Sequence, residues 1–228
     1  MKELCRHFYC IAVDTMGGPG KSIPNENYDI KSFDQIDWIN EVVTLLKIDN
    51  INITGVSNGA AMAFRYAVNE SRKVNKVVCI EGGMVISPLK SFISTMLMLF
   101  PEILFPTRKN MIKAMSKMVS PKSNLYAKHP EVIEQMVMVV KAHNQKAMFG
   151  HKPEKYNKEK AMKVREKLYF LLGDHMVETS KIRKEFVEIL NDGGFRYEII
   201  NDAGHALNHE QPEIVNNKII DFILNSTH

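Results

Sequence analysis

The sequence has few cysteines and no long apolar run, and both absences exclude classes of protein. Its three cysteines, Cys5, Cys10 and Cys79, are odd in number and lack the spacing of metal ligands. They therefore predict free thiols in a reducing compartment and neither a disulfide framework nor a metal site. The longest apolar candidate, residues 92–105, is interrupted by a proline and a glutamate and is too short to span a bilayer. No basic segment followed by an apolar run and a cleavage site opens the chain, so we expect a cytoplasmic protein without an integral membrane segment.

The sequence also lacks a basic patch interleaved with aromatic residues, so nucleic acid is not an expected partner. The net charge of +4 is unevenly spread: residues 84–165 hold 15 Lys and Arg against 5 Asp and Glu, and the rest of the chain is net acidic. A solvated helical surface explains this distribution most simply, and a surface that faces anionic substrates or lipid headgroups is the alternative.

Short β-branched runs alternate with helical patterns over much of the chain. Predicted strands cover residues 7–13, 51–56, 76–80, 167–172 and 197–200, and predicted helices cover residues 33–46, 60–69, 179–191 and 211–224. This order predicts an α/β fold, with a mostly parallel sheet and helices on both faces. A glycine-dense loop, Thr15 to Ser22, follows the first strand, but it has the spacing of neither nucleotide fingerprint and no helix starts after Lys21, so nucleotide binding is not favoured.

The alternation stops for about 80 residues in the middle of the chain. Apolar residues keep helical spacing in segments 110–119 and 130–143, which predicts a helical insertion between two strands. We therefore divide the chain into a core, residues 1–86 and 166–228, and a cap, residues 87–165. Nine of the 14 methionines fall between Met84 and Met148. They favour core packing, and an adaptable wall over an apolar ligand is the functional alternative.

The predicted strand at residues 51–56 leads into a serine that is flanked by glycines, Gly55-Val56-Ser57-Asn58-Gly59. This pattern is typical of a nucleophile elbow, in which a tight turn from strand to helix lifts the serine hydroxyl clear of its neighbours. The chemistry needs glycine where side chains would collide in that turn. The helix that follows directs amide hydrogens and partial positive charge at the point where an oxyanion would form. Ser57 is therefore the candidate nucleophile, and an ordinary turn is the alternative.

A serine nucleophile needs a base, and His205 is the best candidate among the eight histidines. It follows the last predicted strand in the order strand, Ala-Gly-His, then a helix that starts with proline. A loop in that place can bring an imidazole over the carboxyl edge of the sheet. The imidazole can then take the serine proton and pass it on, and a carboxylate is needed to orient the ring.

With these motifs, the chain resembles an α/β-hydrolase of the carboxylesterase and acyl-hydrolase type. Asp14 with residues 17–22 resembles the loop after the family's fourth strand, Gly55 to Gly59 its elbow, residues 203–213 its histidine loop and last helix, and residues 88–165 its helical cap. The resemblance covers nearly the whole chain. It implies hydrolysis of an ester or related acyl bond through a seryl intermediate, a small apolar acyl substrate, and no metal or organic cofactor.

The orienting acid departs from the family pattern. The acid commonly lies three residues after the glycine that ends the penultimate strand, and that position is Met176 here. We expect Asp174 to serve as the acid. Glu81, which occupies the site used by some relatives such as haloalkane dehalogenases, and Glu178 are the alternatives, and each could also be a solvated loop carboxylate.

The oxyanion site departs from the pattern as well. In the family, two or three strands and a His-Gly loop precede the segment that begins at Met1, so we expect an N-terminally shortened hydrolase. That loop supplies one of two oxyanion amides, which leaves the Asn58 amide as the expected donor. Loss of one donor costs about 10² to 10³ in rate. The missing neighbouring strand would also leave the ladder between residues 7–13 and 51–56 unmatched.

The leading prediction is a serine hydrolase with Ser57 as nucleophile, His205 as base, Asp174 as acid and Asn58 as oxyanion donor. A catalytically impaired or non-enzymatic hydrolase-like binding protein is the alternative from another class. A third possibility keeps the triad but changes the reaction, for example to carbon–carbon bond hydrolysis or a haloperoxidase-like reaction, because the triad residues do not set the substrate.

Overall fold

The computed structural model describes residues 2–142, 146 and 150–225. It contains a four-stranded sheet in the order β1 (Ile51–Val56), β2 (Val74–Ile80), β3 (Leu168–Gly173) and β4 (Arg196–Ile200). Every neighbouring pair is parallel, and Val56 at the end of β1 lies opposite Ile80 at the end of β2. The carboxyl ends of all four strands therefore meet at one edge of the sheet. The predicted α/β fold with a parallel sheet is confirmed.

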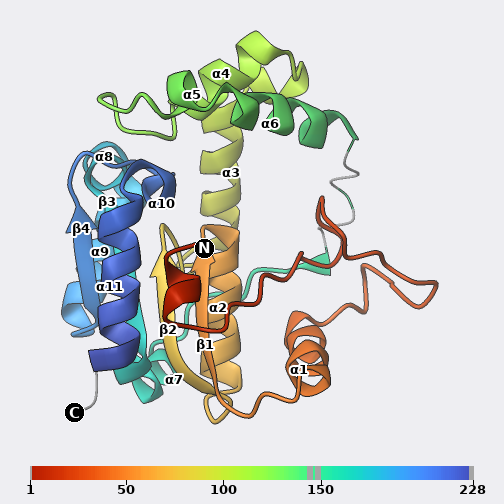
Figure 1. Ribbon diagram of the computed structural model, residues 1–228, viewed down its shortest axis with the longest axis vertical. Coiled ribbons are helices and arrows are strands. Elements are labelled where there is room, and N and C mark those ends of the chain that lie inside the picture. The colour runs from red at the N-terminus through yellow and green to blue at the C-terminus, as the bar shows by residue number, and fades with distance from the viewer. Residues whose placement is uncertain (1, 143–145, 147–149, 226–228) are drawn as a thin grey trace.

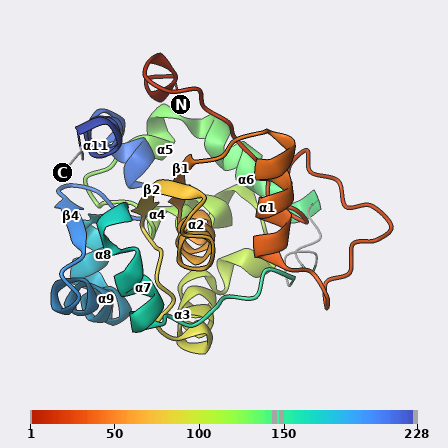
Figure 2. The same cartoon turned by 90° about the horizontal axis from the view of Figure 1, so that it is seen from below.

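Alternate residues of the central strands pack on opposite faces of the sheet, as the period of two along a strand requires. On β3, Leu168, Phe170 and Leu172 belong to the core under α2 (Asn58–Asn69) and α9 (Lys181–Asp192), whereas Tyr169 and Leu171 pack under α11 (Pro212–Asn225). Figure 2 shows α9 and α11 on opposite sides of β4. Both faces of the two central strands are covered, which explains why these strands are apolar runs without polar alternation.

Local sequence signals place most of the predicted helices. The Asp34 side chain accepts hydrogen bonds from the backbone N–H groups of Ile36 and Asp37 and so caps α1 (Gln35–Leu45). Ser180 caps α9 in the same way through the Arg183 N–H. Pro212 occupies the first position of α11, where its missing N–H costs no hydrogen bond. The structure adds a short helix that the sequence pattern did not predict, α8 (Asp174–Thr179).

Between β2 and β3 the chain forms a series of helices. They are α3 (Pro88–Leu99), η2 (Glu102–Leu104), α4 (Arg108–Ser116), α5 (Leu125–Lys128), α6 (Pro130–Ala142), α7 (Lys158–Lys163) and η4 (Arg165–Lys167). Figure 1 shows α4, α5 and α6 grouped at the top of the molecule, beyond the end of α3. Met111, Ala114 and Ile133 form a small core between α4 and α6. The predicted helical insertion is therefore present. His143, the predicted end of the helical segment 130–143, and Met148, the last of the nine methionines, lie outside the described residues.

The predicted strand at residues 7–13 is wrong. After a short 3-10 helix, η1 (Leu4–Arg6), this segment is irregular and mostly exposed, and Tyr9 is 92% exposed. In the described sheet β1 is an edge strand that pairs with β2. The free edge of β1 could offer ladder partners, but residues 7–13 do not pair with it, so this run lacks the hydrogen bonds that would make it a strand. In the loop that follows, Asp14 Oδ2 accepts from Lys21 N, and Ser22 Oγ donates to Asp14 O, so the loop closes on itself.

None of the helices in the described part of the chain is both long enough and apolar enough to cross a membrane. Helix α3 is nevertheless largely exposed, and its apolar residues continue into the following turn. Those exposed by more than a third are Leu89, Phe92, Ile93, Met96, Leu97, Phe100, Leu104 and Phe105.

Candidate active site

The candidate residues all follow the carboxyl ends of strands. Ser57 comes directly after β1, Glu81 directly after β2, Asp174 directly after β3, and His205 lies in the loop after β4. The backbone joins the first two, because Ser57 N donates to Ile80 O at 2.8 Å, one residue before Glu81. The parallel topology thus brings residues that are up to 148 positions apart to one edge of the sheet.

Ser57 has the strained backbone of a nucleophile elbow. Its φ of 55° and ψ of −114° lie where a non-glycine residue is rarely found. Such a conformation costs about 1–3 kcal/mol and persists only where surrounding structure enforces it. Here the enforcement comes from β1, which enters the turn paired to β2, and from α2, which leaves it one residue later.

The two glycines of the elbow have different roles. A Cβ on Gly55 would lie 2.1 Å from the carbonyl oxygen of Gly59 and 2.6 Å from Ala60 N, so β1 can approach α2 this closely only with glycine. A Cβ on Gly59 would meet nothing within 4 Å. The expectation that both glycines prevent a collision is therefore confirmed for Gly55 and wrong for Gly59.

Asn58 is the first residue of α2, so its N–H has no partner within the helix. Across the residues that the structure describes, this N–H donates to no other backbone or side-chain acceptor. It points from the positive end of a 12-residue helix. An N–H group at this position is available to bind a negatively charged oxygen.

His205 is held by its backbone and faces a carboxylate with its ring. Its N–H donates to the carbonyl oxygen of Met118 at 2.6 Å. Its Nδ1 lies 3.4 Å from Glu81 Oε2, and the imidazole is largely buried. With Nδ1 toward the acid, Nε2 is the nitrogen left for proton transfer. Within the described residues, the Ser57 hydroxyl makes no hydrogen bond to the imidazole in this conformation.

The expectation that Asp174 orients His205 does not match this geometry. Asp174 Oδ1 accepts from His175 N at 2.7 Å and Ala203 N at 3.1 Å, and Oδ2 accepts from Asp202 N at 2.9 Å. Burial alone would raise the pKa of Asp174, but these backbone hydrogen bonds outweigh it and hold the pKa below the ordinary 3.8. Both oxygens are thus engaged by the backbone, and Asp174 ties the start of the histidine loop to the end of β3.

Glu81 is the carboxylate that the fold places against the imidazole. It is 1% exposed and has a positive φ of 52°. Its Oε1 accepts from Gly173 N at 2.5 Å. Its Oε2 lies 3.2 Å from Arg183 Nη2 and 3.4 Å from His205 Nδ1, but neither contact has the alignment of a hydrogen bond. A buried carboxylate oxygen with two positively charged or chargeable neighbours and no aligned donor is poised to accept from the imidazole.

One more predicted carboxylate, Glu178, and one residue that was not predicted, Arg183, complete the description. Glu178 lies exposed near the end of α8, and among the described residues it forms no hydrogen bond or ion pair with His205. Arg183, on α9, donates through Nη2 to the backbone oxygen of Glu81 at 2.5 Å and is 17% exposed at its side chain. No motif marks Arg183, because the contact depends on how α9 packs beside β2.

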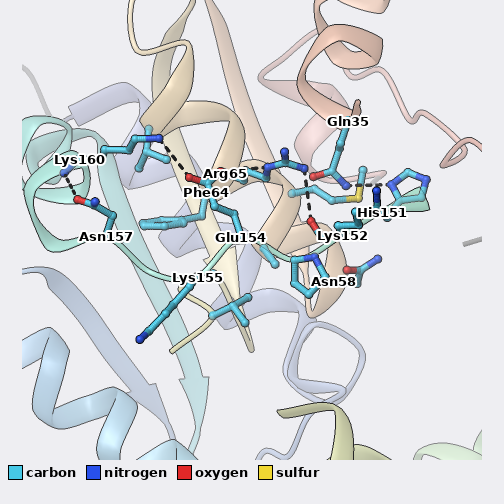
Figure 3. Close-up of a pocket in the computed structure, with 16 residues that line it drawn as sticks. Gln35, Asn58, Phe64, Arg65, His151, Lys152, Glu154, Lys155, Asn157 and Lys160 are labelled. Carbon is cyan, nitrogen blue, oxygen red and sulfur yellow. Dashed lines mark hydrogen bonds and ion pairs between the residues drawn. The ribbon is translucent and has the colours of Figure 1, made fainter. Parts of the chain in front are cut away.

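A separate cleft lies beside the first turns of α2 (Figure 3). Arg65 pairs with Glu154 across it at 3.2 Å, and buried Gln35 donates to His151 Nδ1 at 2.9 Å. Burial lowers the pKa of His151. Asn58 lines this cleft, whereas Ser57, Glu81 and His205 do not. Its polar groups are largely paired with one another, and it adjoins the candidate residues only at the elbow.

In the part of the chain that the structure describes, no group of three or more His, Cys, Asp and Glu side chains is arranged to hold a metal ion. Glu81, His205 and Arg183 form a charge cluster around the Glu81 carboxylate.

Comparisons with known proteins find one fold family and relatives that are named carboxylesterases. The model of the alpha/beta hydrolase fold family matches residues 1–212. The chain is 24% identical over 221 residues to carboxylesterase YbfK of Bacillus subtilis, covering 95% of this chain and 71% of the relative. It is also 24% identical over 217 residues to an uncharacterized carboxylesterase, nap, of the same bacterium, covering 92% and 69%.

Solved structures show the same fold. The crystal structure of YbfK from Bacillus subtilis has a TM-score of 0.67 at 19% identity and covers 93% of this chain and 73% of that one. Naproxen esterase from Bacillus subtilis has a TM-score of 0.67 at 21% identity and covers 89% and 70%.

Proposed function

This chain belongs to the α/β-hydrolase fold family, and from that premise we propose that it hydrolyses carboxylic esters with Ser57 as nucleophile and His205 as general base. Glu81 replaces Asp174 as the orienting acid in this proposal, and the Asn58 amide is the oxyanion donor. Two observations support it: Ser57 has the strained backbone of an elbow directly after β1, and His205, in the loop after β4 of the same parallel sheet, turns its Nδ1 toward the buried Glu81.

The chemistry follows from these positions. As Ser57 Oγ bonds to the ester carbonyl carbon, its proton passes to His205 Nε2, and the carbonyl oxygen becomes an oxyanion near Asn58 N–H. The imidazolium then returns the proton to the alcohol oxygen as the C–O bond breaks. Water repeats the sequence on the acyl-enzyme and releases the acid.

Glu81 has two functions in this cycle. It selects the tautomer that carries hydrogen on Nδ1, and its charge stabilises the imidazolium that forms during attack. Gly173 N–H and Arg183 hold the carboxylate in place, so little reorganisation is needed when the charge appears.

The substrate class rests on the relatives. Two relatives bear the name carboxylesterase, and one related structure is described as a naproxen esterase, so we propose a carboxylic ester with an apolar acyl group. The cap helices α4 to α6 belong to the segment in which we expect its pocket, and Met111 and Met115 pack in their small core.

The alternative is a hydrolase-like binding protein without turnover. One observation favours it: the Ser57 hydroxyl and the His205 imidazole are not hydrogen-bonded in the described residues. Catalytic hydrogen bonds are often long or misaligned without substrate, so we place the enzyme first.

A fluorophosphonate probe and a short-chain nitrophenyl ester separate the two. We expect the probe to label wild-type protein at Ser57 and Ser57→Ala to abolish labelling and turnover. Ser71, half-buried on the turn after α2, gives the matched control: Ser71→Ala should label like wild type. Background turnover and no labelling, in a chain that melts cooperatively, would establish the binding-protein alternative.

A further inference from the structure

The chain segment after α4 lies directly on the histidine loop. Met118 O accepts from His205 N at 2.6 Å. A Cβ added to Gly204 would lie 2.5 Å from Met118 O and 2.7 Å from Val119 Cα, so the two backbones touch because residue 204 has no side chain. Gly204, the residue before the candidate base, thus packs against residues 118 and 119 of the helical insertion.

Glu210 joins the same two segments. It ends the short helix α10 (Leu207–Glu210), five residues after His205. Its Oε2 accepts from Gly204 N at 2.7 Å, and its Oε1 accepts from Ser120 N at 2.8 Å. One carboxylate therefore satisfies a buried backbone N–H on each side of the contact.

The Tyr126 side chain of the insertion also lies near the Glu210 carboxylate. The hydroxyl of Tyr126, on α5, is buried without a hydrogen-bond partner among the described residues. Burial raises the pKa of Tyr126 to about 12, and the nearby Glu210 charge adds to that rise. The carboxylate of Glu210 is therefore enclosed by the insertion and by the histidine loop.

We propose that Glu210 is a positioning residue that fixes His205 by clamping the histidine loop to residues 118–120 of the cap. This inference rests on the proposed function for its catalytic consequence. Asp174 holds the opposite end of the loop, residues 202 and 203, to β3. The loop is thus tied to the core by one carboxylate and to the cap by the other, and a change in cap position is passed to the base through Glu210.

Substitution of Glu210 by glutamine gives the sharpest test. Glutamine keeps one acceptor oxygen but places an NH₂ group against the second backbone N–H, so one arm of the clamp is lost. Because a 1 Å misplacement can cost about 100-fold, we expect Glu210→Gln to lower kcat and the rate of fluorophosphonate labelling at Ser57 by about 10- to 100-fold. KM for a nitrophenyl ester should change less than threefold, because Glu210 contacts backbone and not the proposed acyl group.

Glu213→Gln is the matched control. Glu213 lies three residues further on, in the first turn of α11, and is exposed. It removes the same charge from the same region without touching the loop, and it should leave kcat within about twofold of wild type. Labelling of Glu210→Gln at the wild-type rate would overturn the proposal.

Hydrogen exchange tests the clamp without a variant. In wild-type protein, the amides of Ser120, Gly204 and His205 should be protected and should exchange at a common rate, since they open together. Exchange of Ser120 and Gly204 at the rate of an unprotected loop would overturn the proposal even if Glu210→Gln fails to fold. Absence of labelling in the wild type would instead refute the proposed function. The exchange rates would then still test whether Glu210 holds the two segments together.

Discussion

Two isosteric substitutions, Glu81→Gln and Asp174→Asn, decide which carboxylate orients His205. Glu81 Oε2 lies 3.4 Å from Nδ1, whereas the oxygens of Asp174 accept three backbone N–H groups. An amide at position 81 presents a neutral oxygen or an NH₂ group to Nδ1. The imidazolium then loses its stabilising anion, and the wrong tautomer becomes accessible.

The structure predicts a much larger loss of kcat for Glu81→Gln than for Asp174→Asn. Glu81→Gln should lower kcat on the order of 10⁴-fold, which corresponds to about 5.4 kcal/mol of transition-state stabilisation. Its fold should survive, because Gly173 N–H can still donate to the amide oxygen and Arg183 keeps its bond to the backbone oxygen of residue 81. Asp174→Asn leaves one backbone N–H without an acceptor, which costs about 1–3 kcal/mol of stability. We expect it to lower kcat by no more than about tenfold.

The assay combines turnover of a nitrophenyl ester, the fluorophosphonate labelling rate of Ser57, and thermal unfolding followed by circular dichroism. Rates are compared well below the lowest melting temperature, so that loss of fold does not count as loss of chemistry. Glu188→Gln, an exposed glutamate on α9, is the matched control and should equal wild type. The reasoning is refuted if Asp174→Asn loses about 10⁴-fold while Glu81→Gln stays near wild type.

Three further predictions concern stability and reactivity. Gly55→Ala should lower the free energy of unfolding by about 3 kcal/mol or more, because its Cβ would overlap Gly59 O, whereas Gly59→Ala should change it by less than about 1 kcal/mol, and urea denaturation checks both. The pKa of Asp174 is lower in the folded protein than its ordinary 3.8, so its stabilisation is present above that value and is lost as pH falls through the lower folded pKa. Wild type should therefore lose more stability than Asp174→Asn between pH 6 and pH 3, and equal losses in urea titrations would contradict this. Burial raises the pKa of the Cys79 thiol far above its ordinary range, so Ellman's reagent should modify exposed Cys5 in the native protein and reach Cys79 only after unfolding.

The parts of the fold that could be predicted are those that local patterns determine. The β-branched run before the elbow gives β1 at its observed bounds, Ile51–Val56, and Ser180 marks the start of α9 by its capping side chain. The run at residues 7–13 shows the limit of this reasoning. It has the composition of a strand, but a strand also needs a neighbour, and composition does not report whether one is present.

In the candidate site, too, local sequence marks some residues, whereas others depend on how distant segments pack. Ser57 and His205 can be proposed from the sequence because a turn or a loop of definite sequence surrounds each of them. Arg183 is not found, because its contact with Glu81 depends on the packing of α9 across 102 positions of sequence. The place of Asp174 after a strand predicts an orienting acid, but a short acidic side chain at the start of a helix can also bond to nearby backbone N–H groups. The structure gives it that role, through His175 and the two residues of the histidine loop.

The acid can come from β2 instead of β3 because these two strands are neighbours and end at the same edge. Gly173, the last residue of β3, donates its N–H to Glu81 Oε1, so the side chain of Glu81 reaches across the end of β3 toward the loop after β4. Glutamate is one methylene longer than aspartate, which gives it this reach. Gly173 in turn lets the histidine loop come close to the end of β3, because a Cβ there would lie 2.4 Å from Ala203 O. What the geometry requires is one buried carboxylate facing Nδ1, and the parallel sheet offers more than one strand end that can supply it. Sequence position after a given strand is therefore a weak guide to the acid, whereas burial of the carboxylate against the imidazole is a strong one.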